Sequence, residues 1–192
     1  HAISVIRELL NTSFDNITIT GKKYDEKITQ TKSRNEQFFD GKLHDIESKH
    51  IVLDWENKRA IYDFSSEQYR SPIRTKHWHI KGTRGEIIND RVYYLDEHHK
   101  PQQALINVMK RDQEVLKITF KEQVLYQQPS CGLNEDEIAI ARLLEKMKAY
   151  IVHKQEIYPM INALEDAYLS LLFNQFNKDA YQSITYNQKP TI

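Results

Sequence analysis

Four side chains near the middle of the chain have the chemistry to bind a small polar molecule. His77 and His79 are separated by one residue, so a strand there would carry both imidazoles on one face. Tyr69 and Arg74 lie shortly before that strand. Sugars and polyols are bound by hydrogen-bond donors and acceptors above a flat or aromatic surface. We therefore predict that Tyr69, Arg74, His77 and His79 form the floor of a substrate site, the alternative being that Arg74 pairs with a carboxylate and Tyr69 packs in the core.

The two histidines also have the spacing of two metal ligands on a strand. A protein zinc site needs at least three ligands of the right type. The pairs His98-His99 and His44/His50 have no spacing that would complete such a set. The sequence therefore predicts no metal site, and the histidines are interpreted as polar residues on an open sheet face.

The residues around this candidate site alternate in the manner of strands. Trp78 and Ile80 alternate with the histidines, and Gly82 and Gly85 bracket a Thr83-Arg84 turn. Short alternating runs continue on both sides without a helix-sized segment between them, which favours an antiparallel meander over parallel βαβ units. We predict strands at residues 17–28, 50–55, 59–65, 75–81, 86–89, 91–96, 102–109, 115–120, 122–128 and 181–186, with a long polar excursion at 29–49.

Helical patterns lie at the two ends of the chain. A stripe of Ile3, Ile6 and Leu9 opens it, and Asn134 with Glu137 has the pattern of a capping box before a second stripe. We predict that this second stripe and a third one are both core faces and that Glu165 and Asp166 form a solvated edge. Their members are Ile140, Leu143, Leu144, Met147 and Ile151, and then Ile161, Leu164, Tyr168, Leu171 and Leu172.

These patterns together predict the fold class. We expect an α+β protein with a mostly antiparallel, open-faced sheet and helices packed on one face. A length of 192 residues and a 40% hydrophobic composition fit one domain spanning residues 1–192 with a substantial core.

Charge and composition narrow the functional classes. Lys plus Arg and Asp plus Glu both number 27, so the formal net charge is zero, which argues against a nucleic-acid-binding protein. The sequence has no apolar run long enough to span a bilayer and no signal-peptide pattern. Cys131 is the single cysteine, so no internal disulfide can form, which fits a cytoplasmic protein. There is no Gly-x-Gly-x-x-Gly fingerprint and no phosphate-binding loop, so no cofactor-binding residue is predicted in the chain itself.

Five segments in order resemble the C-terminal domain of the glucose–fructose oxidoreductase / inositol dehydrogenase (Gfo/Idh/MocA) family. The Gly-Thr-x-Gly-Glu-Ile run starting at Gly82 is the most recognisable of them. The resemblance covers nearly the whole chain but only the second half of such an enzyme. The segments are His1–Ile6, Gln68–Arg74, Lys81–Ile87, Leu133–Ala141 and Tyr158–Tyr168.

The resemblance implies an activity and a catalytic residue. It implies the substrate-side domain of an NAD(P)-dependent oxidoreductase acting on a sugar, an inositol or a related hydroxy or keto compound. His1 would be the catalytic residue that handles the substrate hydroxyl proton. Many relatives carry an aspartate three residues after this histidine, where this chain has Ser4, which weakens a hydrogen-bonding role for that position.

The resemblance also implies what the chain works with. NAD or NADP would be bound mainly by an upstream Rossmann domain that is absent from this chain, so we expect the 192 residues alone to be inactive. A homodimer or homotetramer through the sheet is expected, with no nucleic-acid or membrane partner.

Two alternatives stay open. His1 begins the chain inside a helical pattern, which is interpreted as the start of a fragment, although a residue left from an affinity tag would look the same. The chain as a whole is alternatively a non-catalytic sensor or oligomerisation module of the same architecture.

Overall fold

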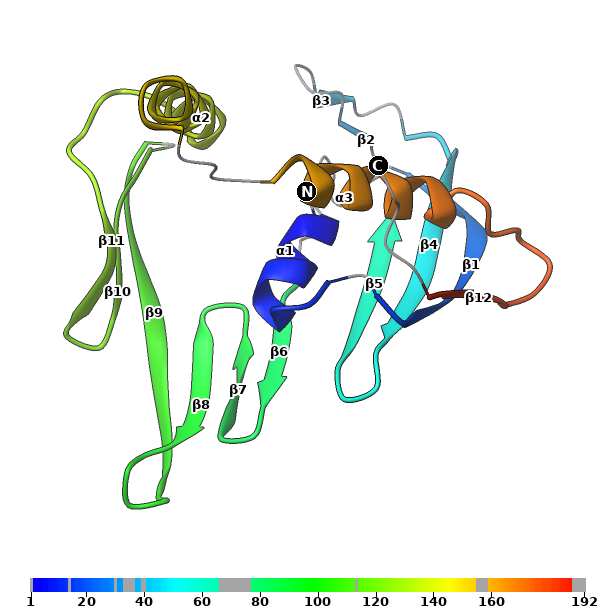
Figure 1. The fold of residues 1–192 in the computed structure, drawn as a ribbon, viewed down its shortest axis with the longest axis horizontal. Helices are drawn as coiled ribbons and strands as arrows, with labels where there is room; N and C mark the ends of the chain where they lie inside the picture. Colours follow the sequence, from blue (N-terminus) through cyan, green and yellow to red (C-terminus); the bar gives the residue numbers. More distant parts are fainter. Residues whose placement is uncertain are drawn as a thin grey trace. The chain divides into compact units, whose positions relative to one another are not determined.

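The computed structural model describes residues 2–13, 15–29, 31–32, 37–38, 41–65, 77–112, 114–154 and 159–187 (Figure 1). The chain divides into two compact units: unit 1 comprises His1–Lys76 with Tyr158–Ile192, and unit 2 comprises His77–Ile157. The predicted α+β class is confirmed, and the strands belong to two antiparallel sheets of four and six strands and a two-stranded ribbon. The prediction of a single domain over residues 1–192 stays a prediction.

Unit 1 is a four-stranded antiparallel sheet with two helices. The strand order is β12-β1-β4-β5, so the last strand of the chain pairs with the first long one. The edge strand predicted at 181–186 is therefore confirmed. The elements are α1 (Ala2–Leu10), β1 (Ile17–Ile28), β2 (Thr31–Lys32), β3 (Gln37–Phe38), β4 (His44–Asp54), β5 (Arg59–Ser65), α3 (Met160–Phe173) and β12 (Gln182–Tyr186).

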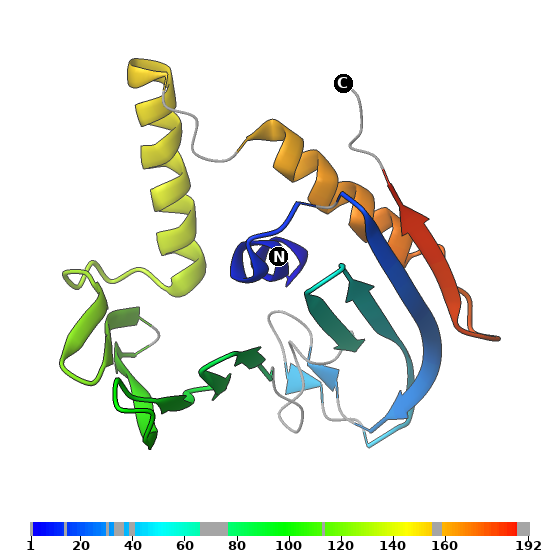
Figure 2. The same ribbon diagram turned by 60° about the horizontal axis from the view of Figure 1, so that its bottom comes forward.

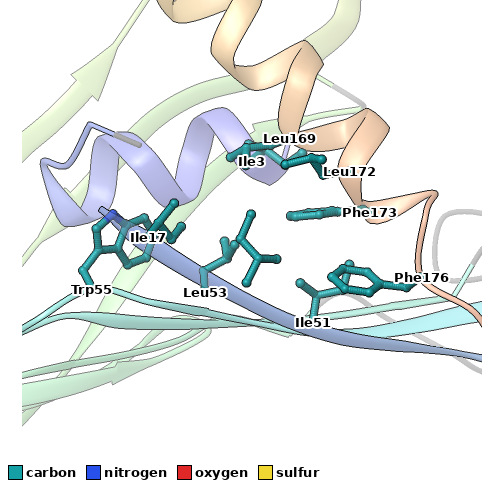
Figure 3. Close-up of a cluster of buried hydrophobic side chains, with 10 residues drawn as sticks. Ile3, Ile17, Ile51, Leu53, Trp55, Leu169, Leu172, Phe173 and Phe176 are labelled. Carbon is teal, nitrogen blue, oxygen red and sulfur yellow. The ribbon is translucent and has the colours of Figure 1, made fainter. Parts of the chain in front are cut away.

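The core of unit 1 lies between the sheet and both helices. Ile17 and Ile19 of β1 alternate inward with no exposed surface, as do Ile51 and Leu53 of β4. Figure 3 shows Ile17, Ile51 and Leu53 on the strands below and the side chains of α1 and α3 above them. Burying large aliphatic side chains contributes roughly 1.5–3 kcal/mol each, so this cluster is the main source of stability in unit 1. Its members from outside the two strands are Ile3, Trp55, Leu169, Leu172, Phe173 and Phe176.

An ion pair joins the two helices at the edge of this core. The Arg7 guanidinium donates two hydrogen bonds to the Asp166 carboxylate, each 3.1 Å long. The Arg7 side chain is only 5% exposed and that of Asp166 18% exposed. A bidentate pair of this kind fixes the rotation of both partners, because a guanidinium and a carboxylate match in a single plane. The pair therefore holds α1 against α3.

The sequence interpretation of α3 was wrong about which side is buried. Glu165 is buried rather than part of a solvated edge, and Leu171 of the predicted core stripe is exposed. The helix is apolar on more than one side, so periodicity alone defined two possible core faces. The buried face is the one that carries Leu169, Leu172 and Phe173 into the cluster beneath.

The predicted excursion at residues 29–49 is shorter in the structure, because β4 already begins at His44. The whole of β4 pairs with β1, from Ile28 opposite His44 to Thr18 opposite Asp54. Polar cross-strand pairs stabilise the first half of β4, which the sequence pattern assigned to the excursion. One of them is a Lys27–Asp45 contact of 3.1 Å. A polar strand has no alternating apolar signal, which is why this segment was missed.

Unit 2 is an antiparallel meander followed by one helix. Strand order follows the chain without a crossover, from β6 at one edge to β11 at the other. Figure 2 shows α2 as one continuous helix after the last strand of the meander. The elements are β6 (His79–Gly82), β7 (Gly85–Ile88), β8 (Arg91–Leu95), β9 (Pro101–Arg111), β10 (Glu114–Phe120), β11 (Gln123–Gln127) and α2 (Glu135–His153).

The capping box predicted before α2 is confirmed. The Asn134 side chain accepts hydrogen bonds from the backbone N–H groups of Asp136 and Glu137, both 3.0 Å long. The Glu137 carboxylate accepts one from the Asn134 N–H at 2.8 Å. These contacts satisfy N–H groups that a helix start otherwise leaves without partners.

A buried carboxylate ties the connection before α2 to the sheet. Glu114 at the start of β10 is 4% exposed and accepts hydrogen bonds from Ser130, Cys131 and Gly132. These bonds, first of all that from the Cys131 backbone N–H and then that from its thiol, lower the pKa of Glu114 to about 2. The carboxylate is therefore ionised at neutral pH, when it holds this connection in place.

Unit 2 differs from unit 1 in its apolar side chains. All buried hydrophobic side chains among the described residues belong to unit 1. The α2 stripe, which the sequence predicted as a core face, is exposed: Ile140, Leu144, Met147 and Ile151 are 52% to 67% exposed. That prediction was wrong, because amphipathic spacing identifies an apolar face of a helix but does not identify the surface that packs against it. None of the helices in the described ranges is long and apolar enough to cross a membrane.

We predict that the buried ion pair contributes much more to the stability of unit 1 than an exposed one does. Replacing Arg7 by Met removes the guanidinium from a mostly buried carboxylate, that of Asp166, which is expected to lower the unfolding free energy by about 3 kcal/mol. The matched control is Lys27→Met, whose pair with Asp45 is 64% and 77% exposed and is expected to change it by less than about 1 kcal/mol. Urea unfolding measures the change in unfolding free energy for both variants. It is followed by the fluorescence of Trp55 in a Trp78→Phe background. Equal effects of the two substitutions would contradict this account.

Candidate functional site

The candidate site is built on the hairpin of β6 and β7. Thr83 and Arg84 form the turn between them, so Gly82 pairs with Gly85 and Lys81 with Glu86. A side chain at Gly85 would place its Cβ 2.1 Å from the Tyr93 carbonyl oxygen. Glycine at this position therefore lets β7 approach β8 closely enough to pair with it.

His79 of β6 forms a pair with Glu86 of β7. Its Nε2 atom lies 2.7 Å from Oε2 of Glu86. The two residues are diagonal neighbours on one face, because His79 lies two residues before Lys81, the cross-strand partner of Glu86. Both side chains are partly exposed to solvent. A histidine and a carboxylate in contact can exchange a proton with a bound hydroxyl group near neutral pH.

An open depression of about 490 Å3 is lined by Glu86 of this pair, whereas His79 is not part of its lining. Its lining combines an ammonium, a carboxylate, a phenol and a carboxamide from Lys81, Glu86, Tyr93 and Gln102. This set offers both donors and acceptors around an aromatic ring, which is the composition that binds polyhydroxyl compounds.

Arg84 lines this depression, and Asp96 holds the turn next to it. Nη2 of the Arg84 guanidinium donates to the carbonyl oxygens of Leu95 at 3.2 Å and Asp96 at 2.7 Å, which ties this side chain to the end of β8. The Asp96 carboxylate accepts hydrogen bonds from the backbone of His98 and Lys100 and from the Gln102 side chain. The Lys100 bond is the main cause that lowers the pKa of Asp96. These contacts fix the turn between β8 and β9, and with it Gln102.

The structure describes two of the five predicted site residues. His1, Tyr69 and Arg74 lie outside the described residues. His77 is described, but it precedes β6, and its side chain is exposed. His79 is the first residue of β6, so the two histidines do not share a strand as the sequence predicted.

No group of three or more histidine, cysteine, aspartate or glutamate side chains in the described ranges is arranged to hold a metal ion. His79 and Glu86 together supply two candidate ligand atoms, which is fewer than a zinc site requires.

Sequence reasoning missed Lys81, Glu86 and Tyr93 as site residues, although a signal for two of them was present. A two-residue turn between glycines sets the register of a hairpin, and counting outward from it pairs Lys81 with Glu86. Tyr93 joins them because it is opposite Glu86 on β8.

A second polar cluster lies on unit 1, on the face of its sheet away from the core. The Tyr24 hydroxyl donates to the Tyr181 hydroxyl at 2.9 Å, which in turn lies 3.1 Å from Nδ1 of His50. The hydrogen bond from Tyr24, followed by partial burial, raises the pKa of Tyr181. The cluster depends on the pairing of β12 with β1 across most of the chain, which no local pattern could indicate.

Comparisons of the chain with protein families, with curated proteins and with solved structures gave no match. The resemblance to the Gfo/Idh/MocA family therefore stays a prediction that depends on the quoted residues.

We predict that the two glycines of the hairpin differ in their tolerance of a methyl group. Gly85→Ala is expected to separate β7 from β8 and disorder the hairpin, because the clash is with backbone that cannot rotate away. Gly82→Ala is the matched control, since the nearest atom to its new Cβ would be the Gly85 carbonyl oxygen, 3.8 Å away. Amide chemical shifts of residues 79–95 measure the effect. Large shifts in both variants, or in neither, would contradict the predicted close approach.

Proposed function

We propose that this chain is the C-terminal, substrate-side domain of an NAD(P)-dependent oxidoreductase that acts on a sugar, an inositol or a related hydroxy or keto compound. In this proposal NAD or NADP is bound mainly by an upstream nucleotide-binding domain. The protein acts in the cytoplasm as a homodimer or homotetramer formed through the sheet.

The observation that carries the proposal is the His79–Glu86 pair beside the depression of the hairpin. This hairpin contains the Gly-Thr-x-Gly-Glu-Ile run on which the family resemblance depends most. Its polar lining supports recognition of hydroxyl groups, since Glu86 accepts hydrogen bonds and Lys81 donates them. The α+β architecture is compatible with the proposal but adds little support, because a fold by itself does not define a function.

The chemistry would be divided between the cofactor and this domain. Hydride transfer is the chemistry of the nicotinamide, and the protein positions the reacting carbon and moves the hydroxyl proton. His1 is the proposed catalytic residue for the proton, since an imidazole titrates near neutral pH. Tyr69, Arg74, His77 and His79 are the proposed substrate contacts, to which Glu86 and Lys81 are added here.

A second candidate function is an interaction module without catalysis. The observation in its favour is the exposure of apolar side chains throughout unit 2, among them Leu105, Met109 and Leu125. Exposed apolar patches of this kind usually mark surfaces that bind another protein.

We predict that the chain binds a polyol through the hairpin and does not oxidise it. Saturation-transfer NMR with myo-inositol and with D-glucose is expected to detect weak binding. Glu86→Gln removes a charged acceptor, which is expected to weaken binding about tenfold or more, and His79→Ala is expected to do the same.

His98→Ala is the matched control for this experiment, because His98 is exposed on the turn between β8 and β9. Turnover by the chain alone with NAD or NADP would contradict the proposed division into two domains. Binding of neither polyol, or equal binding by all variants, would contradict the proposed substrate site.

Light scattering separates the two candidate functions. If His77 and His79 contact substrate, the His77→Ala/His79→Ala variant is expected to keep the solution mass of the wild type. Loss of the oligomer in that variant would instead support the interaction module and contradict the substrate role of both histidines.

A further inference from the structure

The exposed stripe of α2 has the spacing of a coiled-coil seam. Ile140, Leu144, Met147 and Ile151 follow one another at intervals of four, three and four residues. This alternation is the pattern of helices that pack along their length with knobs in holes. Leu143 and Tyr150 widen the stripe on one side, and both are more than half exposed.

The opposite side of α2 is the side that faces its own sheet. Ile138 lines a depression of unit 2 together with Val108, Val115 and Ile118. The Arg142 guanidinium lies 4.8 Å from the centre of the Tyr126 ring on β11. At 100° per residue Ile138 and Arg142 lie on the side of the helix away from the stripe. The helix therefore uses its less apolar side within unit 2 and leaves the seam exposed.

The charges along α2 indicate how a partner helix would be oriented. The first turn carries Asp136 and Glu137, whereas the second half carries Lys146, Lys148 and Lys154. An antiparallel partner of the same sequence would set the acidic start of each helix against the basic end of the other. The two helix dipoles would also oppose each other, which adds to the attraction.

The seam itself matches this antiparallel arrangement residue by residue. With the two-fold axis between Glu145 and Lys146, Leu144 lies opposite Met147 of the second copy, and Ile140 lies opposite Ile151. The same register places Glu137 opposite Lys154, so an ion pair would close the seam at each end. A surface that is complementary to itself in this manner is what a two-fold symmetric contact requires.

We propose that α2 docks against α2 of a second copy of this chain in an antiparallel pair, through the seam of Ile140, Leu144, Met147 and Ile151. The contact is separate from the sheet-mediated assembly in the proposed function and does not depend on it. Its occupant is a second copy because the charge order and the seam register of α2 are complementary to α2 itself.

Light scattering with the full chain tests the proposal. Leu144→Lys/Met147→Lys places good helix formers at exposed positions, so the helix is expected to stay intact while loss of the α2 contact halves the solution mass of the wild type. Val152→Lys is the matched control on the same helix, because Val152 is 61% exposed but lies off the seam. Ile61→Lys is the control on the sheet of unit 1, where another exposed apolar side chain is replaced. Both controls are expected to keep the solution mass of the wild type.

Cross-linking tests the antiparallel register. In a Cys131→Ser background, a mixture of Leu144→Cys and Met147→Cys chains is expected to form a mixed disulfide dimer, and neither chain alone is expected to cross-link. Cross-linking within each single variant would mean a parallel pair and would overturn the register.

A monomeric wild-type chain, which would mean that the stripe is covered within the chain itself, would overturn the proposal. So would a solution mass that Leu144→Lys/Met147→Lys leaves unchanged and Ile61→Lys lowers.

Discussion

An antiparallel sheet with an apolar face is stable in water only if something covers that face, and the two units meet this constraint differently. Unit 1 supplies its own cover, because α1 and α3 place Ile3, Leu169 and Phe173 over Leu53 and its neighbours (Figure 3). In unit 2 the described apolar side chains of the meander and of α2 stay partly or largely exposed. The physical difference is in the helices: both unit 1 helices present apolar residues to their sheet, whereas α2 presents Ile138 and Arg142.

This difference separates a unit with a buried core from a unit whose polar side chains meet solvent. The Arg7–Asp166 pair and the core beneath it determine where α1 lies, and α1 directly follows the proposed catalytic residue His1. The hairpin of β6 and β7 is held instead by backbone pairing and by the close approach at Gly85. Its polar side chains can therefore meet solvent and ligand without burial of an unpaired charge. A strand hairpin is a suitable support for a substrate site, since it fixes the register of Lys81, Glu86 and Tyr93 on one face.

Much of the fold could be predicted from sequence because its signals are local. The alternation of Ile17 with Thr18, the capping box at Asn134 and the glycines around Thr83 each act within a few residues, and each prediction is confirmed. The errors have a common physical cause. Glu165 looked solvated because its partner surface comes from another part of the chain, and the α2 stripe looked like core because amphipathicity does not identify the covering surface.

The candidate site was predictable to a similar degree. His79 could be found from its residue type, and Glu86 from the register of a two-residue turn. The Tyr24–Tyr181–His50 cluster could not, because it requires the pairing of residues far apart in the sequence. Pairing between strands that are far apart in the sequence depends on the interactions of all strands in the sheet, and no local pattern encodes it.

Hydrogen exchange of the full chain at several protein concentrations tests most directly the claim that unit 1 covers its own apolar face and α2 does not. We predict that the amides of β1 and β4 exchange slowest and at rates independent of protein concentration. The amides of α2 should become more protected as concentration rises, since their cover comes from a second molecule. Strong protection of α2 at the lowest concentration, or exchange of β1 and β4 as fast as that of α2, would contradict this account.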